Sequence, residues 1–333
     1  MKSGIFISLI MASTLFLGCE DTDIDSNLDS DNLFNKQPEA EAKVTGNTTF
    51  VVSDTIMLNG GESTDEDGDS LTYSWRIKTT PNQSNATLIN ETSATPSFIA
   101  DIPGEYAIEL IVNDGIENSR PDSVYITVVE SLVTHDELEY GVIVSEDTGR
   151  KWLDRNIGST EVCRSYRTED CYGDYFQWGR GIDGHEQANS LVSDILATDI
   201  DNSGSRFIAA FSADNFDWVS VDLDGTQRAA NWSATDGSSV CPVDFRVPTI
   251  NELEAENISN QRDGSINNLN IPAAGYKNNV GELKRAGDEI YLLSTTIDDI
   301  NSSKIFSYAI NEDAAQRYSD NRVFAQSVRC IED

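Results

Sequence analysis

Alternation between apolar and polar positions dominates the first third of the chain. Apolar or aromatic residues occupy every second position of residues 71–77 (LTYSWRI), and residues 104–115 and 124–129 repeat the pattern. A period of two is typical of β-strands that bury one face, and Gly, Pro, Asn and Asp gather between these stretches as they do at turns. The pattern predicts a small antiparallel β-sandwich over residues 44–130, with Trp75 in its core.

The C-terminal part, residues 139–333, shows shorter apolar stretches separated by loops. A hairpin is predicted around the Asp-Thr-Gly turn at 147–149. Helical patterns are limited to residues 188–197 and to the residues after Thr249, a helix cap with Glu252 three positions on, as in a capping box. Short strands account for most of the remainder, so we expect an α+β domain with irregular loops.

The N-terminus has the composition of an export signal. One Lys precedes an apolar run in residues 1–18 that is too short for a comfortable membrane span, and Cys19 follows. The ending Leu-Phe-Leu-Gly-Cys resembles the lipobox of bacterial lipoproteins, which implies that Cys19 is lipidated; an ordinary secretory signal with a coincidental cysteine is the alternative. Residues 19–43 are rich in Asp, Ser and Asn without periodicity, which predicts an acidic disordered tether. We therefore expect a lipid-anchored protein of the bacterial cell envelope, in the outer membrane and exposed at the surface.

The charge of the chain excludes one class of partner. Its 333 residues include 23 Lys and Arg against 57 Asp and Glu, a formal net charge of -34. Such an excess of negative charge repels nucleic acids and favours cations. We therefore expect no nucleic-acid ligand, and we look for the partner among extracellular or envelope glycans and proteins.

The five cysteines fit an oxidising compartment. Assigning Cys19 to lipid leaves Cys163, Cys171, Cys241 and Cys330, an even set that allows three pairings. The favoured pairing joins Cys163 to Cys171, which are eight residues apart around a polar turn, and Cys241 to Cys330 in the last strand of the chain. Metal ligation is the weaker alternative, because no CxxC spacing occurs.

An acidic loop in the predicted sandwich offers oxygen ligands to a cation. Asp65, Asp67 and Asp69 alternate along one turn, and Asp114 could join them if the loops meet at one end. Carboxylates suit Ca²⁺, but the loop is not an EF-hand, since Arg76 stands at its twelfth position, where a bidentate Glu is required. A solvated turn without a cation is the other interpretation.

Two stretches of the predicted sandwich resemble a known domain. LNGGESTDEDGDSLTYSWRI followed by ADIPGEYAIELIVNDG looks like a PKD domain, an immunoglobulin-like module common in extracellular proteins, over nearly all of residues 44–130. The resemblance implies an all-β immunoglobulin-like sandwich that acts as a spacer or a binding surface.

A second resemblance covers residues 139–333, after a linker at 131–138. The strings GRKWLDRNIG, CYGDYFQWGR, CPVDFRVPTINEL, IPAAGY, YLLSTT and SVRC together resemble the Fibrobacter-type major paralogous domain. That resemblance implies the α+β C-type lectin-like fold, which also underlies formylglycine-generating enzymes. It implies a bacterial surface module and supplies no activity, because one fold hosts many functions.

The candidate ligand-binding residues are aromatic or lie in one polar loop. Aromatic platforms with polar rims suit glycans, but the alternative that these aromatic side chains form the domain core is favoured. The loop histidine could be a metal ligand or a base, although such a residue is more often merely solvated. The candidates are Trp178, Arg180, Asp183, His185, Trp218, Trp232 and Tyr276.

The sequence gives little support to catalysis. Only His135 and His185 are available for a catalytic triad or a histidine metal site. The oxidase chemistry of formylglycine-generating relatives needs reactive thiols, which the two expected disulfides would consume. We therefore expect a non-catalytic surface binding or adhesion protein. The alternatives are an enzyme of the formylglycine-generating type or an unrecognised hydrolase, and a structural envelope component without a ligand.

Overall fold

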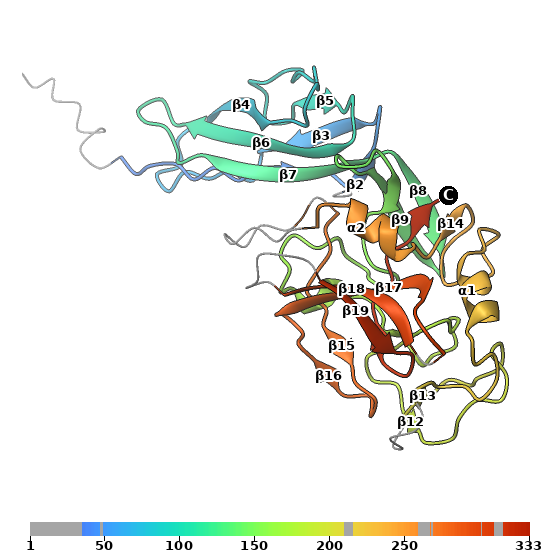
Figure 1. The fold of residues 1–333 in the computed structure, drawn as a ribbon. Coiled ribbons are helices and arrows are strands. Elements are labelled where there is room, and N and C mark those ends of the chain that lie inside the picture. Colours follow the sequence, from blue (N-terminus) through green and yellow to red (C-terminus); the bar gives the residue numbers. More distant parts are fainter. Residues whose placement is uncertain are drawn as a thin grey trace, which may run out of the picture.

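The computed structural model describes residues 35–46, 49–209, 216–258, 267, 269–300, 302–309 and 316–333. Figure 1 shows an elongated N-terminal sandwich that lies across one end of a larger C-terminal domain. The predicted signal peptide and the lipidation site at Cys19 lie outside the described residues, so both stay predictions.

Two sheets face each other in the N-terminal domain. Their core contains Trp75 and Tyr106, whose exposed fractions are 3% and 0%. The indole N–H of Trp75 donates to the Ser93 carbonyl at 3.1 Å, so its burial leaves no unpaired donor. The alternation in the sequence therefore predicted the buried face of each long strand. One sheet contains β1 (Lys43–Val44), β3 (Thr55–Asn59) and β5 (Ser97–Ile99), and the other contains β2 (Thr49–Val51), β7 (Asp122–Val129), β6 (Gly104–Asn113) and β4 (Thr72–Thr79).

The sandwich begins earlier than the predicted tether allows. Residues 35–43 fall in the range expected to be disordered, yet Glu39 exchanges backbone hydrogen bonds with Thr64. The Asn35 amide donates to Asp114 at 2.9 Å, and the Ala42 amide donates to Asp122 at 2.7 Å. These bonds attach the segment to the sandwich although it buries little apolar surface, and composition alone does not reveal them.

The predicted linker at 131–138 is a pair of strands instead. β8 (Ser131–His135) pairs with β9 (Leu138–Val144), and both belong to the C-terminal domain. Only Glu130 separates β7 from β8, and its amide donates to the Val142 carbonyl at 2.8 Å. The two domains are therefore joined by continuous β-structure.

The C-terminal domain is built from short sheets around two helices and a 3-10 turn, so it is mostly β-structure. The predicted hairpin is confirmed, with Trp152 opposite Ile143. The four sheets contain, in spatial order, β14 (Phe245–Arg246), β21 (Ile331–Glu332), β10 (Lys151–Leu153), β9 and β8; β11 (Phe176–Gln177), β20 (Ala325–Gln326), β15 (Tyr276–Lys277) and β16 (Leu283–Lys284); β12 (Val192–Ser193) and β13 (Phe207–Ile208); and β17 (Glu289–Ile297), β18 (Ser302–Ala309) and β19 (Gln316–Asn321).

One of the two helical predictions is confirmed. Helix α2 (Ile250–Ala255) starts at Thr249, whose hydroxyl accepts from the Glu252 amide while the Glu252 carboxylate accepts from the Thr249 amide. The helix expected at residues 188–197 is wrong. That segment contains bends and β12, and its Leu191 and Ile195 are 66% and 76% exposed. A helix there would have no apolar surface to pack on, and packing supplies most helical stability.

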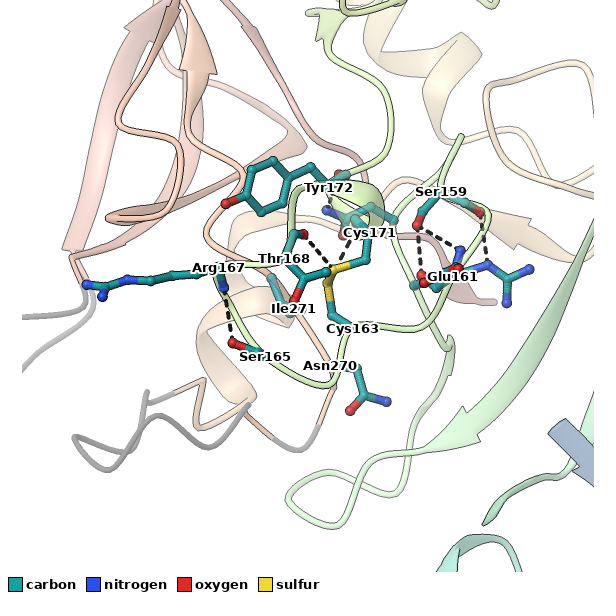
Figure 2. Close-up of a disulfide and its surroundings, with 12 residues drawn as sticks. Ser159, Glu161, Cys163, Ser165, Arg167, Thr168, Cys171, Tyr172, Asn270 and Ile271 are labelled. Carbon is teal, nitrogen blue, oxygen red and sulfur yellow. Dashed lines mark hydrogen bonds between the residues drawn. A yellow bond between two sulfur atoms is a disulfide. The ribbon is translucent and has the colours of Figure 1, made fainter. Parts of the chain in front are cut away.

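Helix α1 (Thr226–Trp232) and the 3-10 turn η2 (Glu169–Cys171) were not predicted. The favoured cysteine pairing is confirmed: one disulfide joins Cys163 to Cys171 beside η2 (Figure 2), and the other joins Cys241 to Cys330. The second lies in the core with the indoles of the domain, so the C-terminal end of the chain is anchored covalently in the domain interior.

Candidate functional site

The three tryptophans proposed as ligand contacts lie in the core. Trp178, Trp218 and Trp232 are 0%, 0% and 1% exposed, and each indole N–H donates to a backbone carbonyl. Each ring therefore satisfies its one polar group inside the domain and has no open face for a ligand. The core interpretation is confirmed, and these three tryptophans are excluded as surface contacts.

Arg180 is also buried and holds a loop together. Its guanidinium donates to Asp183 and Ser203 at 2.9 Å, to Gln177 at 2.8 Å, and to backbone carbonyls of residues 204 and 206. A buried charge requires such complete pairing. Arg180 therefore fixes the conformation of residues 177–206 and does not reach a ligand.

His185 is fully buried, so the expectation of a solvated loop histidine is wrong. Its Nδ1 lies 2.7 Å from Asp183 and 3.2 Å from Glu186. Within the described ranges these three side chains form the one group of at least three His, Cys, Asp or Glu ligands whose atoms lie within 4.8 Å of one another. The loop thus has the donor set of a metal site.

The hydrogen bonds of the ring argue against a metal at this group. The Gln177 backbone amide donates to His185 Nε2 at 3.0 Å, so Nε2 must carry the lone pair and Nδ1 the proton. Nδ1 then donates to Asp183 and has no lone pair for a cation. Burial alone would raise the pKa of Glu186, but hydrogen bonds from His185 and backbone amides lower it to about 2. The group is a buried hydrogen-bond network that shapes its loop.

Tyr276 is the one aromatic candidate that stays partly exposed. Its ring centroid lies 4.9 Å from that of Tyr291 and 5.8 Å from that of Phe324. All three rings are partly exposed, and they come from β15, β17 and the turn between β19 and β20. We call these three residues the aromatic face.

Two carboxylates flank the aromatic face. The Tyr291 hydroxyl donates to Glu289, and Asp320 accepts from the Gln326 amide at 2.8 Å. Burial raises the pKa of Asp320 to about 6, and these hydrogen bonds only partly offset it. Strand register places Glu289 and Tyr291 on one face of β17, since successive side chains point to opposite faces. The aromatic face therefore has acceptors at its rim.

Sequence reasoning missed Tyr291 and Phe324. Tyr291 stands between Ile290 and Leu292, which are both buried, so a period of two would have placed its ring on the opposite, less buried face. Phe324 gave no signal, because it lies in a turn whose neighbours are decided by the packing of β15 and β17.

The acidic loop of the sandwich is organised by its own backbone. One oxygen of Asp65 accepts from the amides of Asp67 and Asp69 at 2.9 and 3.0 Å. Asp114 instead accepts from the amides of residues 116 and 117 and from Asn35. Across the described part of the chain these carboxylates do not gather within ligand distance of one another. Their hydrogen bonds favour the solvated-turn interpretation, and Ca²⁺ binding stays a prediction.

In the part of the chain that the structure covers, no helix is both long enough and apolar enough to cross a bilayer.

The comparisons with known proteins define the class of the N-terminal domain. Residues 45–128 match the family model described as a PKD domain. The sandwich predicted from alternation thus falls in the family that its sequence resembles. No curated protein matches the chain.

Three solved structures show partial likeness. A nucleoside hydrolase-related hypothetical protein from Saccharophagus degradans, associated with carbohydrate metabolism, is 26% identical with a TM-score of 0.25, over 28% of this chain and 26% of that one. The PKD domain of a peptidase from a Thermoplasmatales archaeon is 22% identical with a TM-score of 0.21, over 28% of this chain and 97% of that one. A SusE-like surface located polysaccharide binding protein from the Bacteroides thetaiotaomicron heparin utilisation locus is 14% identical with a TM-score of 0.23, over 84% of this chain and 42% of that one.

Proposed function

We propose that this chain is a non-catalytic binding protein of the bacterial cell surface, attached to the outer membrane through a lipid on Cys19. The observation that carries the binding role is the aromatic face. Three partly exposed rings meet at the surface there, although the tryptophans of the same domain are fully buried. Clustered aromatic side chains left at a surface are typical of binding sites.

A glycan fits the aromatic face better than a protein ligand. Aromatic rings pack against the C–H faces of sugars, and the carboxylates of Glu289 and Asp320 can accept hydrogen bonds from sugar hydroxyls. The site combines a few polar groups with apolar surface, as small-molecule sites generally do.

The remaining parts of the chain have supporting roles in this proposal. The PKD domain and the acidic residues before it act as a spacer that holds the C-terminal domain away from the membrane. We extend the proposal to the C-type lectin-like fold that the motifs of residues 139–333 imply, with a sugar site that does not depend on Ca²⁺.

A binding measurement on the full chain tests the aromatic face. We expect a glycan array to identify a ligand, and Tyr276→Ala to weaken its binding about tenfold or more, which is the loss of at least 1.4 kcal/mol. Tyr276→Phe keeps the ring and serves as the matched control, with binding close to that of the unmodified chain. If Tyr276→Ala binds as tightly as the control, the aromatic face is not the site.

The enzyme alternative has its own test. All four cysteines in the described residues are paired, which leaves no thiol there for oxidase chemistry. We expect a thiol titration of the native exported protein to find none of these four reactive. Two or more free thiols would support the formylglycine-generating type instead.

A further inference from the structure

A cleft separates the sandwich from the C-terminal domain. It has a volume of about 930 Å³ and lies between β7 with the turn at 102–105 on one side and the end of β9 with residues 162–164 on the other. A neighbouring cavity of about 650 Å³ shares Thr127, Val162 and Arg164 with it. Figure 1 shows the sandwich lying across this end of the C-terminal domain, with β7 close to β8 and β9. The volume lies in the range of small-molecule binding sites, which often form between domains.

The two walls of the cleft are held in place. β7 continues into β8 through Glu130, and a Cβ added at Gly141 would come within 2.6 Å of Val129. This close approach of β9 to the end of β7 needs a glycine at position 141. The cleft is therefore formed before any ligand arrives, which reduces the ordering cost of binding.

Polar side chains from both domains converge on the cleft without partners of their own. Asn82, Gln83 and Glu105 come from the sandwich. Arg164 and Asn270 come from the C-terminal domain, where Figure 2 shows Asn270 near the Cys163 disulfide. None of these side chains has a hydrogen bond or ion pair to another residue among those the structure describes. Their donors and acceptors are consequently available to a ligand.

The lining also has apolar surface suited to the C–H face of a sugar. The Tyr125 ring is 45% exposed on β7, and Val144 is 41% exposed across the cleft. A mixture of amides, carboxylates and a guanidinium around an exposed ring matches the alternating hydroxyl and C–H groups of a saccharide.

Charge narrows the class of saccharide. The 930 Å³ cavity is lined by three carboxylates, Glu105, Glu130 and Glu146, against the single guanidinium of Arg164. A polyanion would meet net repulsion there, and the chain as a whole carries -34. We propose that the cleft between the domains is a second binding site, for a short neutral oligosaccharide that contacts both domains at once.

The test uses the full chain and four uncharged hexasaccharides, cellohexaose, xylohexaose, maltohexaose and mannohexaose, with an oligogalacturonate as the charged comparison. We expect saturable binding of at least one neutral probe by calorimetry and none of the oligogalacturonate. A ligand that needs both domains folded and docked raises the unfolding temperature of both, because binding stabilises only the state that it contacts. A ligand on the aromatic face raises that of the C-terminal domain alone, so the two sites are distinguishable.

Variants then locate the bound probe. Tyr125→Ala and Arg164→Ala should each weaken binding about tenfold, while Arg206→Ala, at an exposed arginine away from the cleft, should leave it unchanged. Tyr276→Ala should not weaken it. Failure of all four neutral probes to bind, tighter binding of the oligogalacturonate, or full affinity in both cleft variants would overturn the proposal.

Discussion

Replacing both Cys241 and Cys330 with alanine should destabilise the C-terminal domain far more than replacing Cys163 and Cys171. The first disulfide spans 89 residues of sequence and the second spans 8. In the chain-entropy account, a cross-link stabilises the folded state by restricting the unfolded chain, and the effect grows with the logarithm of the loop length.

The lengths of the two loops set the magnitude. A loop of 89 residues corresponds to about 4.6 kcal/mol at 25 °C and a loop of 8 to about 2.5 kcal/mol, a difference of about 2 kcal/mol. Cys241 and Cys330 are also fully buried in the main core, so removing their sulfur atoms adds a cavity term. The difference of about 2 kcal/mol is therefore a lower bound within this account.

Urea unfolding followed by tryptophan fluorescence measures the effect. Trp75 is the single tryptophan of the sandwich, and the other four tryptophans belong to the C-terminal domain, so fluorescence reports mainly on that domain. The sandwich transition, followed by circular dichroism, serves as an internal control and should not move. Equal losses in the two double variants, or a larger loss for the Cys163 and Cys171 pair, would refute the reasoning from loop length.

Three further expectations concern ionisable groups. Because the pKa of Glu186 is lowered from 4.5 to about 2, its ionised form stabilises the domain by up to about 3 kcal/mol above pH 4.5, and this is lost as the pH falls toward 2; Glu186→Gln should flatten that acid limb in pH-dependent urea unfolding, and an unchanged limb would contradict it. Asp320 has the opposite sign: its pKa is raised from 3.8 to about 6, so its ionisation lowers stability by up to about 3 kcal/mol as the pH rises from 3.8 to 6, and Asp320→Asn should remove that decline, unless the carboxyl is more solvated than the structure shows. Adding Zn²⁺ or Ca²⁺ should leave both melting temperatures unchanged, because His185 Nδ1 carries a proton and residues 65–69 are bonded to their own backbone; a shift in the C-terminal domain or in the sandwich would contradict the respective argument.

Local rules recovered much of this architecture. Alternation around Trp75 predicted the buried faces of the sandwich, and a Thr249 cap followed by Glu252 predicted helix α2. Loop length and turn composition favoured the observed disulfide pairing. Each of these features depends on residues that are close in sequence or on a periodic pattern, which is why one chain without relatives was enough to predict them.

The candidate site depended on contacts between distant segments. Whether an aromatic ring is core or surface is decided by whether its polar group finds a partner inside: Trp178 reaches the Ser294 carbonyl 116 positions away, while Tyr276 meets Tyr291 and Phe324 at the surface. The sequence by itself thus determined the strands, the helix cap, the cysteine pairs and the acidic charge of this protein. Only the tertiary structure decided which rings face solvent and which polar groups face the cleft, because long-range packing and hydrogen bonding settle both.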